Sequence, residues 1–385
     1  MKTQISRSIL ESVISRTKTS PHDKLVIYDF SGDYTAGFPV KERGVDRNAN
    51  PAETYGDPML QDYMIFSPGD KRSWSWDVAR DIRTEADADF FANSFVPDSE
   101  DECWLGSVRA TIKEAIVSLQ QKMGESWSWG DLFLAVKGEG QGSATSILVN
   151  TLQTIRFLET NHKNDRKISF REWAQNPDTR RIILLSEFPL DKFRFFGDRK
   201  KISRTILSVI GHVSMTLSQP FGGVTPEKKR LWFFLDEFPQ LGKLNLLPKL
   251  FEQGRASGIC LILGVQDYTQ LKEIYGGKIA EQILANCGIR IALRTLSPKT
   301  LKKLKKLFSA TNGNTNTIGS HAEIVYPGKE TPVFVQNKNL PETLSGCGPV
   351  REGIRAVVSM PPTHTFLFTW PYVTWRTRRP ASVGE

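Results

Sequence analysis

The chain has 385 residues, 39% of them hydrophobic and 24% charged, a balance that is typical of a globular protein and excludes a largely disordered one. Fifty-one basic residues against 42 acidic ones give a net charge of +9, which permits a polyanionic partner but is modest for this length. Apolar runs reach about five or six residues, far short of the ~20 that span a bilayer, and no signal peptide opens the chain. The four cysteines are widely spaced, so we expect a reduced, cytoplasmic protein as written. No histidine pair has the spacing of a metal-protease site, which disfavours that class of enzyme.

A helix followed by a strand is predicted at the start of the chain. Apolar residues recur at helical spacing from Ile5 to Ile14, and residues 24–29 are typical of a buried strand. A helix and then a strand is the order expected just after a phosphate-binding loop of pattern G-x-x-x-x-G-K-[ST]. The chain holds no complete copy of this pattern. We therefore interpret Lys2 and Thr3 as the last two residues of such a loop, with its glycines encoded upstream. Asp29, which ends the strand, is expected near the nucleotide without an assigned role.

The middle of the chain is predicted to be helical. Apolar stripes at helical spacing cover residues 108–119 and 147–158, and no convincing strand pattern interrupts them. The glycine-rich run at 138–142 lacks a Gly-Lys-Ser/Thr ending and a preceding strand, which favours a turn between two helices over a nucleotide loop. We interpret this segment as an all-α domain inserted into an α/β fold.

Strands alternate with helices again after Pro177. Three fully apolar runs, at 182–185, 231–235 and 260–265, are typical of central strands of a parallel sheet. The predicted fold is therefore α/β, a RecA-like P-loop NTPase core with a mostly parallel sheet and an inserted all-α domain. The predicted boundaries are 1–80 for the first part of the core, 81–178 for the all-α domain, 179–375 for the second part, and 376–385 for a mobile basic tail.

Two of these strands end in residues suited to ATP hydrolysis. Asp236 and Glu237 follow the second run, where one carboxylate would hold Mg²⁺ and the next would act as general base toward the attacking water. Gln266 follows the third run and would contact the γ-phosphate; the alternative is a solvent-facing amide. Arg255 would reach a neighbouring subunit's nucleotide; the alternative is a cation that stabilises the end of a helix.

A lysine-rich helix is predicted at 299–308. Leucines at helical spacing interleave its lysines, which is the pattern of an amphipathic surface helix; its charged face would either be solvated or follow a phosphate backbone. A glycine- and asparagine-rich loop is expected at 311–319. Short strands predicted at 323–326, 332–336, 356–360 and 366–370 would add antiparallel edge strands to the sheet.

Ordered motifs along nearly the whole chain resemble those of the TraD/TraG group of conjugative coupling proteins. The motifs that carry the resemblance are Asp29-Phe-Ser-Gly-Asp33, Phe66-Ser-Pro through Trp74-Ser-Trp-Asp77, Trp104-Leu-Gly-Ser-Val-Arg109, Phe234-Leu-Asp-Glu-Phe-Pro239, Gly254-Arg-Ala-Ser-Gly258, Gln266-Asp-Tyr-Thr-Gln-Leu271 and Tyr275-Gly276. The resemblance runs from about residue 2 to residue 370. It departs from the family at its start, because relatives have a transmembrane pair and an intact P-loop.

The resemblance implies an ATP-driven motor that delivers single-stranded DNA to a type IV secretion channel. It implies ATP and Mg²⁺ as cofactors, and relaxase or relaxosome proteins and channel subunits as partners of a homo-hexamer. Relatives lie at the cytoplasmic face of the bacterial inner membrane. Lys2 would neutralise phosphate charge, while Thr3 and Asp236 would ligate Mg²⁺.

A rival hypothesis is a non-catalytic remnant that keeps the fold and a DNA-binding or docking surface. Glycines and successive backbone N–H groups form the nest that holds the phosphates, and Met1 stands where the last of these glycines belongs. A third reading, a partitioning or pilus-retraction ATPase, is disfavoured by the all-α insertion and the segment at Gln266. The sequence leaves open whether this chain binds ATP and is therefore an enzyme.

Overall fold

The computed structural model describes most of the chain in thirteen stretches. The described residues are 2–38, 61–67, 69–96, 102–139, 146–160, 166–187, 199–217, 229–295, 297–309, 333–334, 339–360, 364–378 and 381. Contacts divide the chain into two compact units. We call residues 13–263 with 376–385 the central unit, and residues 1–12 with 264–375 the terminal unit.

A five-stranded parallel sheet forms the core of the central unit. Its strand order is β2-β5-β1-β6-β7, and every neighbouring pair is parallel. The strands are β1 (Lys24–Asp29), β2 (Tyr63–Phe66), β5 (Ile182–Ser186), β6 (Leu231–Leu235) and β7 (Ile259–Leu263). The apolar runs thus form the parallel strands that they predict, and β1, in the middle, is buried along its whole length. The sequence analysis missed β2 because its apolar run is only four residues long.

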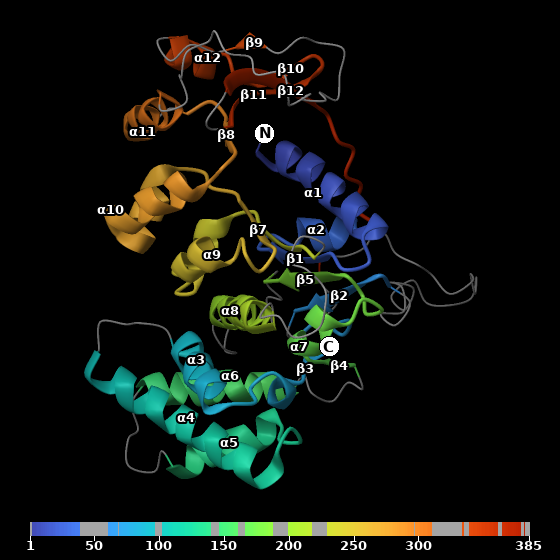
Figure 1. Ribbon diagram of the computed structural model, residues 1–385, viewed down its shortest axis with the longest axis vertical. Coiled ribbons are helices and arrows are strands. Elements are labelled where there is room, and N and C mark those ends of the chain that lie inside the picture. The colour runs from blue at the N-terminus through green and yellow to red at the C-terminus, as the bar shows by residue number, and fades with distance from the viewer. Residues whose placement is uncertain are drawn as a thin grey trace, which may run out of the picture. The chain divides into compact units, whose positions relative to one another are not determined.

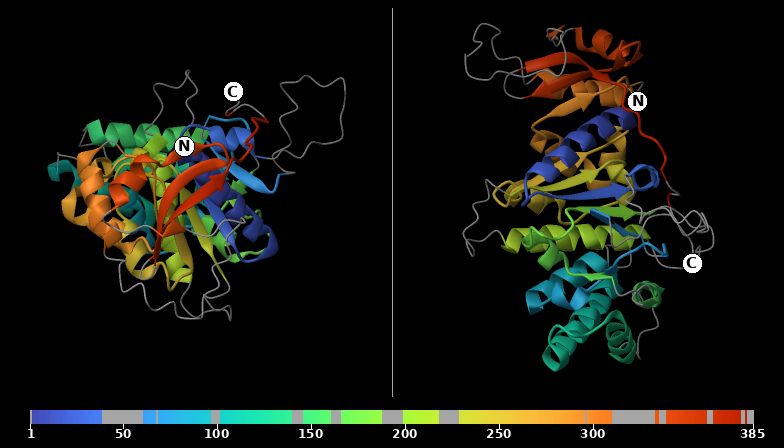
Figure 2. Two further views of the ribbon diagram at one scale, coloured as in Figure 1. Left: turned by 90° about the horizontal axis from the view of Figure 1, so that it is seen from above. Right: turned by 90° about the vertical axis from the view of Figure 1, so that its right-hand side faces the viewer.

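Helices cover both faces of this sheet. The carboxyl-terminal part of α1 (Lys2–Thr19) lies over one face and α8 (Arg199–Leu217) over the other (Figures 1 and 2). Val13 from α1 and Ile206 and Ile210 from α8 are buried. Shorter helices follow the strands: α2 (Asp33–Gly37) after β1, and a 3₁₀ turn, η4 (Phe238–Leu241), with α9 (Leu247–Gln253) after β6. Burial of their apolar faces is what fixes these helices on the sheet.

The middle of the central unit is helical, as predicted. Its elements are η1 (Val78–Arg80), α3 (Glu85–Phe95), α4 (Glu102–Met123), α5 (Trp129–Glu139), α6 (Ser146–Thr160) and α7 (Phe170–Gln175). A short parallel pair, β3 (Ser75–Trp76) with β4 (Lys167–Ile168), closes its two ends and was not predicted. Trp76 and Trp129 pack edge to face at 5.4 Å between ring centroids, so these tryptophans are core residues rather than exposed stacking platforms.

The terminal unit contains an antiparallel sheet. Its strands are β8 (Arg290–Ala292), β9 (Val333–Phe334), β10 (Gly348–Val350), β11 (Gly353–Met360) and β12 (His364–Pro371), accompanied by α10 (Tyr268–Asn286), α11 (Pro298–Ser309) and α12 (Leu340–Ser345). β11 pairs with β8, β10 and β12, and β9 pairs with β12. The prediction that these strands extend the parallel sheet was therefore wrong: among the described residues they pair with one another. The predicted loop at 311–319 and strand at 323–326 lie outside the described residues.

Two further sequence expectations concern the membrane and the tail. In the stretches that the structure describes, no helix has the length and apolar character needed to cross a bilayer. In the tail predicted to be mobile, Arg378 donates its backbone N–H to the carbonyl of Ala36 at 2.9 Å, and the carbonyl of Ala381 accepts from Arg72 at 3.2 Å. The predicted domain boundaries remain predictions.

Candidate functional site

Acidic side chains gather at the carboxyl-terminal edge of the parallel sheet. Because the strands are parallel, their carboxyl ends share one edge, and Asp29, Glu187 and Asp236 stand at the ends of β1, β5 and β6. All three are buried. The backbone N–H of Glu187 donates to the carbonyl of Asp29 at 3.2 Å, which holds the two strand ends together. The structure thus brings Asp29, Asp236 and the following Glu237 to one edge.

Asp29 anchors the turn that follows β1. Its Oδ2 accepts from the backbone N–H of Thr35 at 2.6 Å, and Gly32 takes the left-handed conformation (φ 78°) that allows the chain to turn into α2. The other carboxyl oxygen, Oδ1, is buried and has no hydrogen-bond partner among the described residues. Burial raises the pKa of Asp29 to about 6, against the lowering effect of the hydrogen bonds from Thr35 and Tyr34. A buried carboxyl with an unsatisfied oxygen is costly, which marks this edge as a functional candidate.

Tyr34 links α2 to the acidic pair after β6. Its hydroxyl donates to Oδ2 of Asp236 at 2.6 Å, and its ring packs edge to face on Phe234 at 5.5 Å. The aromatic contact sets the position of the ring, and the hydroxyl then orients the carboxylate of Asp236. Hydrogen bonds of this kind from neighbouring groups are what orient metal-binding carboxylates. Sequence analysis missed Tyr34 because 202 residues separate it from Asp236.

Glu237 has a strained backbone. It has φ 55° and ψ 36°, and among the described residues it is the one non-glycine with a positive φ. Such a conformation costs about 1–3 kcal/mol and persists where the surrounding structure enforces it, often at functional sites. The carbonyl of Glu237 accepts from the backbone N–H of Gln240 at 2.8 Å, which closes the turn that follows. The predicted general base therefore lies at the turn that leads into η4.

Glu187 and Arg204 also belong to this region, and the sequence analysis assigned neither to it. Burial, and then the carboxylate of Glu187, raise the pKa of Tyr28 above its ordinary value, while the Arg204 guanidinium opposes them. A Cβ built on Gly242, just beyond η4, would lie 3.2 Å from Nη1 of Arg204, so this cation from α8 reaches the same loop. Glu187 could have been found by the rule that selected Asp236, since it too follows an apolar strand.

The remaining predicted residues are Arg255 in the central unit and Lys2, Thr3 and Gln266 in the terminal unit. Arg255 is exposed in the turn before β7, at the edge of the sheet opposite Asp236, so the parallel strands keep it away from this chain's own acidic pair. Lys2 and Thr3 occupy the first turn of α1 in the terminal unit, where nearby Ile5 packs with Ile354. Gln266, also in the terminal unit, is exposed and precedes Asp267, the N-cap of α10.

The chemistry of these residues fits Mg²⁺ and part of a nucleotide site. Mg²⁺ prefers oxygen ligands and is commonly held by one or two carboxylates together with substrate phosphates, so the carboxylate of Asp236 suits the protein's share. Among the described residues, no group of three or more metal-ligating side chains forms a complete protein site. Lys2 and Thr3 stand in the first turn of a helix without an acidic residue, as the end of a phosphate-binding loop requires. The glycines of that loop are not in the sequence.

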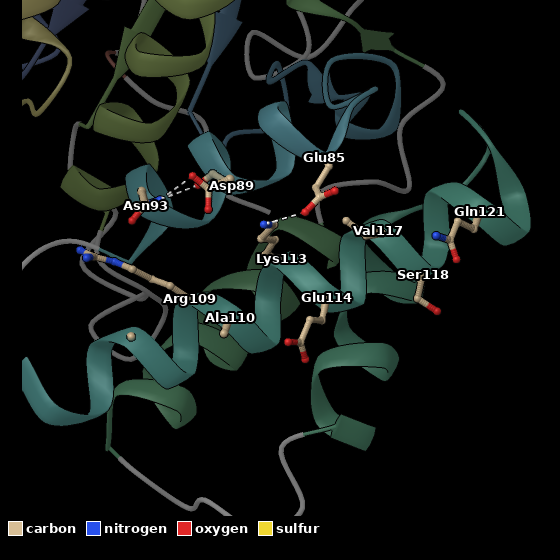
Figure 3. Close-up of a pocket in the computed structure, with 11 residues that line it drawn as sticks. Glu85, Asp89, Asn93, Arg109, Ala110, Lys113, Glu114, Val117, Ser118 and Gln121 are labelled. Atoms are coloured by element: carbon tan, nitrogen blue, oxygen red, sulfur yellow. Dashed lines mark hydrogen bonds and ion pairs between the residues drawn. The ribbon is translucent and has the colours of Figure 1, made fainter.

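A groove of about 700 Å³ lies between α3 and α4, away from this chemistry (Figure 3). Its walls carry both signs of charge, and Lys113 forms an ion pair with Glu85 at 2.9 Å that lowers the pKa of the exposed Glu85. Arg109 donates through Nε and Nη2 to the carbonyl of Val96 at 2.9 and 2.7 Å. Because Val96 ends α3, Arg109 caps that helix, which is a structural reason for an arginine in this motif.

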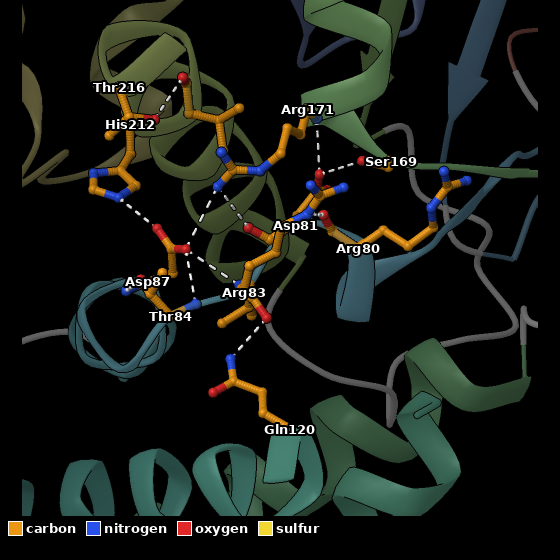
Figure 4. A network of polar contacts seen from close by, with 12 residues as sticks. Arg80, Asp81, Arg83, Thr84, Asp87, Gln120, Ser169, Arg171, His212 and Thr216 are labelled. Carbon is orange, nitrogen blue, oxygen red and sulfur yellow. Dashed lines mark hydrogen bonds and ion pairs between the residues drawn. The ribbon is translucent and has the colours of Figure 1, made fainter. Parts of the chain in front are cut away.

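A network of polar contacts joins the helical segment to α7 and α8 (Figure 4). Asp81 accepts four hydrogen bonds, from Trp76 Nε1, Ser169 Oγ and the backbone N–H groups of Phe170 and Arg171, at 2.6–2.9 Å. Each of its carboxyl oxygens accepts two of them. This carboxylate is fully buried, and both of its oxygens are satisfied by donors from the protein. Its role is therefore structural.

Asp87 extends the network to α8. His212 lies 3.1 Å from its Oδ1, while the backbone N–H of Thr84 and the Arg171 guanidinium donate to Oδ2 at 3.1 and 3.5 Å. Burial acts to raise the pKa of Asp87, but the hydrogen bonds, led by those from His212 and Thr84, outweigh it and lower the pKa to about 2. Gln120 of α4 donates to the carbonyl of Ile82 at 2.7 Å. Helices α3, α4 and α8 are thereby held through polar contacts as well as apolar packing.

Comparison with known proteins gives a consistent result. A family model described as the type IV secretion-system coupling protein DNA-binding domain matches residues 1–137 and 131–323. The coupling protein TraD of Escherichia coli (strain K12) is 27% identical over 305 residues, which are 72% of this chain and 38% of TraD. The chain thus spans well under half the length of this curated relative.

Solved structures show a similar fold. The plasmid coupling protein TrwB in complex with the non-hydrolysable ATP analogue ADPNP has a TM-score of 0.60 at 20% identity, over 94% of this chain and 82% of that one. TrwB in complex with ADP and Mg²⁺ has a TM-score of 0.59 at 20% identity, with the same coverage. At this identity the likeness shows the fold, a parallel α/β core with a helical segment.

Proposed function

Because the chain belongs to the family of type IV secretion-system coupling proteins, we propose that it is the motor segment of a conjugative DNA-transfer protein. It would use ATP hydrolysis to deliver single-stranded DNA, with its relaxase or relaxosome, to secretion-channel subunits, acting as a homo-hexamer beneath the inner membrane. The observation that carries the proposal is the buried acidic edge of the sheet, where Tyr34 holds the carboxylate of Asp236 at 2.6 Å.

Each residue of the site has a distinct task in this proposal. Bound Mg²⁺ supplies charge neutralisation for the phosphates of ATP. Asp236 would help to hold the metal ion, and Glu237, fixed by its strained backbone, would accept the proton of the attacking water. Asp29 would support the α2 turn that carries Tyr34. Within the central unit this assignment rests on the contacts of α2 with the ends of β1 and β6.

The other predicted residues keep the tasks that the sequence analysis gives them. Lys2 would contact phosphate oxygens and Thr3 would ligate Mg²⁺, since both occupy the first turn of α1. Gln266 would contact the γ-phosphate. Arg255, exposed at the opposite edge of the sheet, would serve a neighbouring subunit's nucleotide.

A non-catalytic remnant is the second candidate. The observation that favours it is that the 385 residues contain no complete phosphate-binding loop of pattern G-x-x-x-x-G-K-[ST]. Such a protein would keep the fold and a DNA-binding or docking surface without hydrolysing ATP.

The test is ATP binding and hydrolysis stimulated by single-stranded DNA, measured for the 385-residue chain and for a form extended with the glycine-rich loop. In the active form, Glu237→Gln should lower kcat by about 10²–10⁴ while ATP binding is kept, because only the proton acceptor is removed. Glu252→Gln, at an exposed position on α9, is the matched control and should leave kcat unchanged. Unchanged kcat in Glu237→Gln would refute the role of Glu237, and inactivity of both forms would favour the remnant.

A further inference from the structure

Helix α11 presents one apolar face and one strongly basic face. Its twelve residues, Pro298–Ser309, include five lysines and no acidic residue. Leu301, Leu304, Leu307 and Phe308 pack against a core cluster formed with α12 and β11. Burial of each large apolar side chain contributes about 1.5–3 kcal/mol, so this face determines how the helix is seated. The lysines on the other face are consequently held outward.

Four of the five lysines are exposed: Lys299, Lys302, Lys305 and Lys306. The fifth, Lys303, is turned to α10, where its Nζ lies 2.5 Å from Glu281 Oε1 and 5.5 Å from the ring centroid of Tyr268. Lys303 is thus turned toward α10, whereas the other four lysine side chains are exposed, a difference that the sequence pattern does not reveal. We call these four the outer lysines.

The outer lysines repel one another. Lys302 has Lys299 and Lys305 three residues away and Lys306 four residues away, and like charges at these spacings destabilise a helix by about 0.2–0.5 kcal/mol per pair. A helix face that needed only solubility could interleave acidic residues, and α11 has none. Lys306 in the last turn gains some stability from the helix dipole, but Lys299 in the first turn does not. A surface of this kind is suited to a polyanion, whose charges would replace the repulsion with attraction.

The amino end of α11 is fastened beside a predicted nucleotide contact. Asp267, the N-cap of α10, accepts from the backbone N–H and hydroxyl of Thr269 at 2.7 and 2.8 Å, and from Thr300 Oγ1 of α11 at 2.9 Å. Burial acts to raise the pKa of Asp267, but these hydrogen bonds lower it below its usual value, which keeps the carboxylate ionised. Gln266 is thereby connected to α11 through the hydrogen bond between its neighbour Asp267 and Thr300.

We propose that Lys299, Lys302, Lys305 and Lys306 form a surface that binds the phosphate backbone of single-stranded DNA. The proposed function supplies only the choice of DNA as the polyanion. An anionic membrane is the less suitable partner, because an interfacial helix must insert its apolar face and that face of α11 is buried in the protein. The attachment of α11 at Thr300 gives this surface a fixed position relative to Gln266.

The experiment measures binding of the full chain to a fluorescent thirty-nucleotide oligo-dT by anisotropy across a range of salt concentrations. Replacing all four lysines with Gln should weaken binding about tenfold or more at low salt. It should also reduce the slope of log K against log salt by about 3, because each phosphate contact on a single strand contributes about 0.7. The four Lys→Arg replacements should keep both affinity and slope.

A matched control removes the same charge elsewhere. Lys18, Lys122, Lys137 and Lys249 are exposed and lie outside α11, and their joint replacement with Gln should leave the slope nearly unchanged. Equal losses in the two quadruple variants would show a general charge effect and overturn the proposal, as would an unchanged slope in the α11 variant. Binding to phosphatidylserine vesicles that depends on these lysines, without binding to oligo-dT, would also overturn it. ATP is absent throughout, so failure of the lysine surface is distinguishable from failure of the motor.

Discussion

Two buried carboxylates in the central unit, Asp81 and Asp29, differ in how their oxygens are used. Both are almost inaccessible to solvent, and burial raises the pKa of both. Asp81 receives four donors, two on each oxygen, whereas Oδ1 of Asp29 has no hydrogen-bond partner among the described residues. The comparison teaches that burial alone does not identify a functional carboxylate. A fully satisfied carboxylate stabilises the fold, and an incompletely satisfied one marks a place where a ligand can contribute.

Replacement of aspartate by asparagine should therefore lower the free energy of unfolding most at Asp81. In Asp81→Asn the amide nitrogen would replace an oxygen that accepts two hydrogen bonds. The two buried groups that donate to this oxygen would then face an N–H group instead of an acceptor. We expect a loss of about 3–5 kcal/mol in the free energy of unfolding, measured by urea denaturation with a constant slope m. A loss below about 1 kcal/mol would contradict the structural role given to this carboxylate.

Asp29→Asn should behave differently and depend on pH. The folded-state pKa of Asp29, about 6, is above its unfolded value of 3.8, so the folded protein binds the proton more tightly. The stability that this group contributes is fully present at pH below about 4 and is lost as pH rises through about 6. The Asn variant lacks this loss and should be more stable than the wild type by about 1–3 kcal/mol at pH 7.5. Urea titrations of both proteins at pH 4 and 7.5 measure this difference in the free energy of unfolding. An identical pH dependence of that free energy in both proteins would show that Asp29 titrates normally.

Tyr34→Phe should have the smallest effect on stability and sharpen the comparison at the acidic edge. The variant keeps the edge-to-face contact with Phe234 and removes one hydrogen bond to Asp236, so the expected cost is about 0.5–1.5 kcal/mol. In the form extended with the glycine-rich loop, the Mg²⁺ concentration needed for half-maximal ATP hydrolysis should rise, because the Asp236 carboxylate is less well oriented. A stability cost without any change in Mg²⁺ dependence would make Tyr34 purely structural.

The strand ends show which residues of the candidate site could be predicted from the sequence. Apolar runs ending in Asp29 and Asp236 predicted that these carboxylates share one edge of a parallel sheet, and the structure confirms it. The same rule applied to the run that ends before Glu187 would have found a third buried acid. Arg204 could not have been found in this way, because a helical position carries no signal about which loop a long side chain reaches.

The lysines show more clearly what the sequence could not predict. The spacing of leucines in α11 predicted an amphipathic helix, and the buried leucine face confirms it. Lys201 of α8 stands next to the exposed Lys200 in the sequence, yet it is buried, with Nζ 3.3 Å from Thr151 Oγ1 and 4.5 Å from the ring centroid of Phe95. Because Thr151 is fifty residues away along the chain, no local pattern could have separated this lysine from its exposed neighbours.

The sequence by itself determined the elements, the parallel sheet, the helical segment and the edge at which acidic residues gather, because periodicity and apolar runs are local properties of the chain. Only the tertiary structure decided that the carboxyl-terminal strands form a separate antiparallel sheet. It also decided that Tyr34 orients Asp236, and that Asp81 is satisfied while Asp29 is not. The physical reason is that a hydrogen bond depends on two groups meeting within about 3 Å, and these partners come from distant parts of the chain.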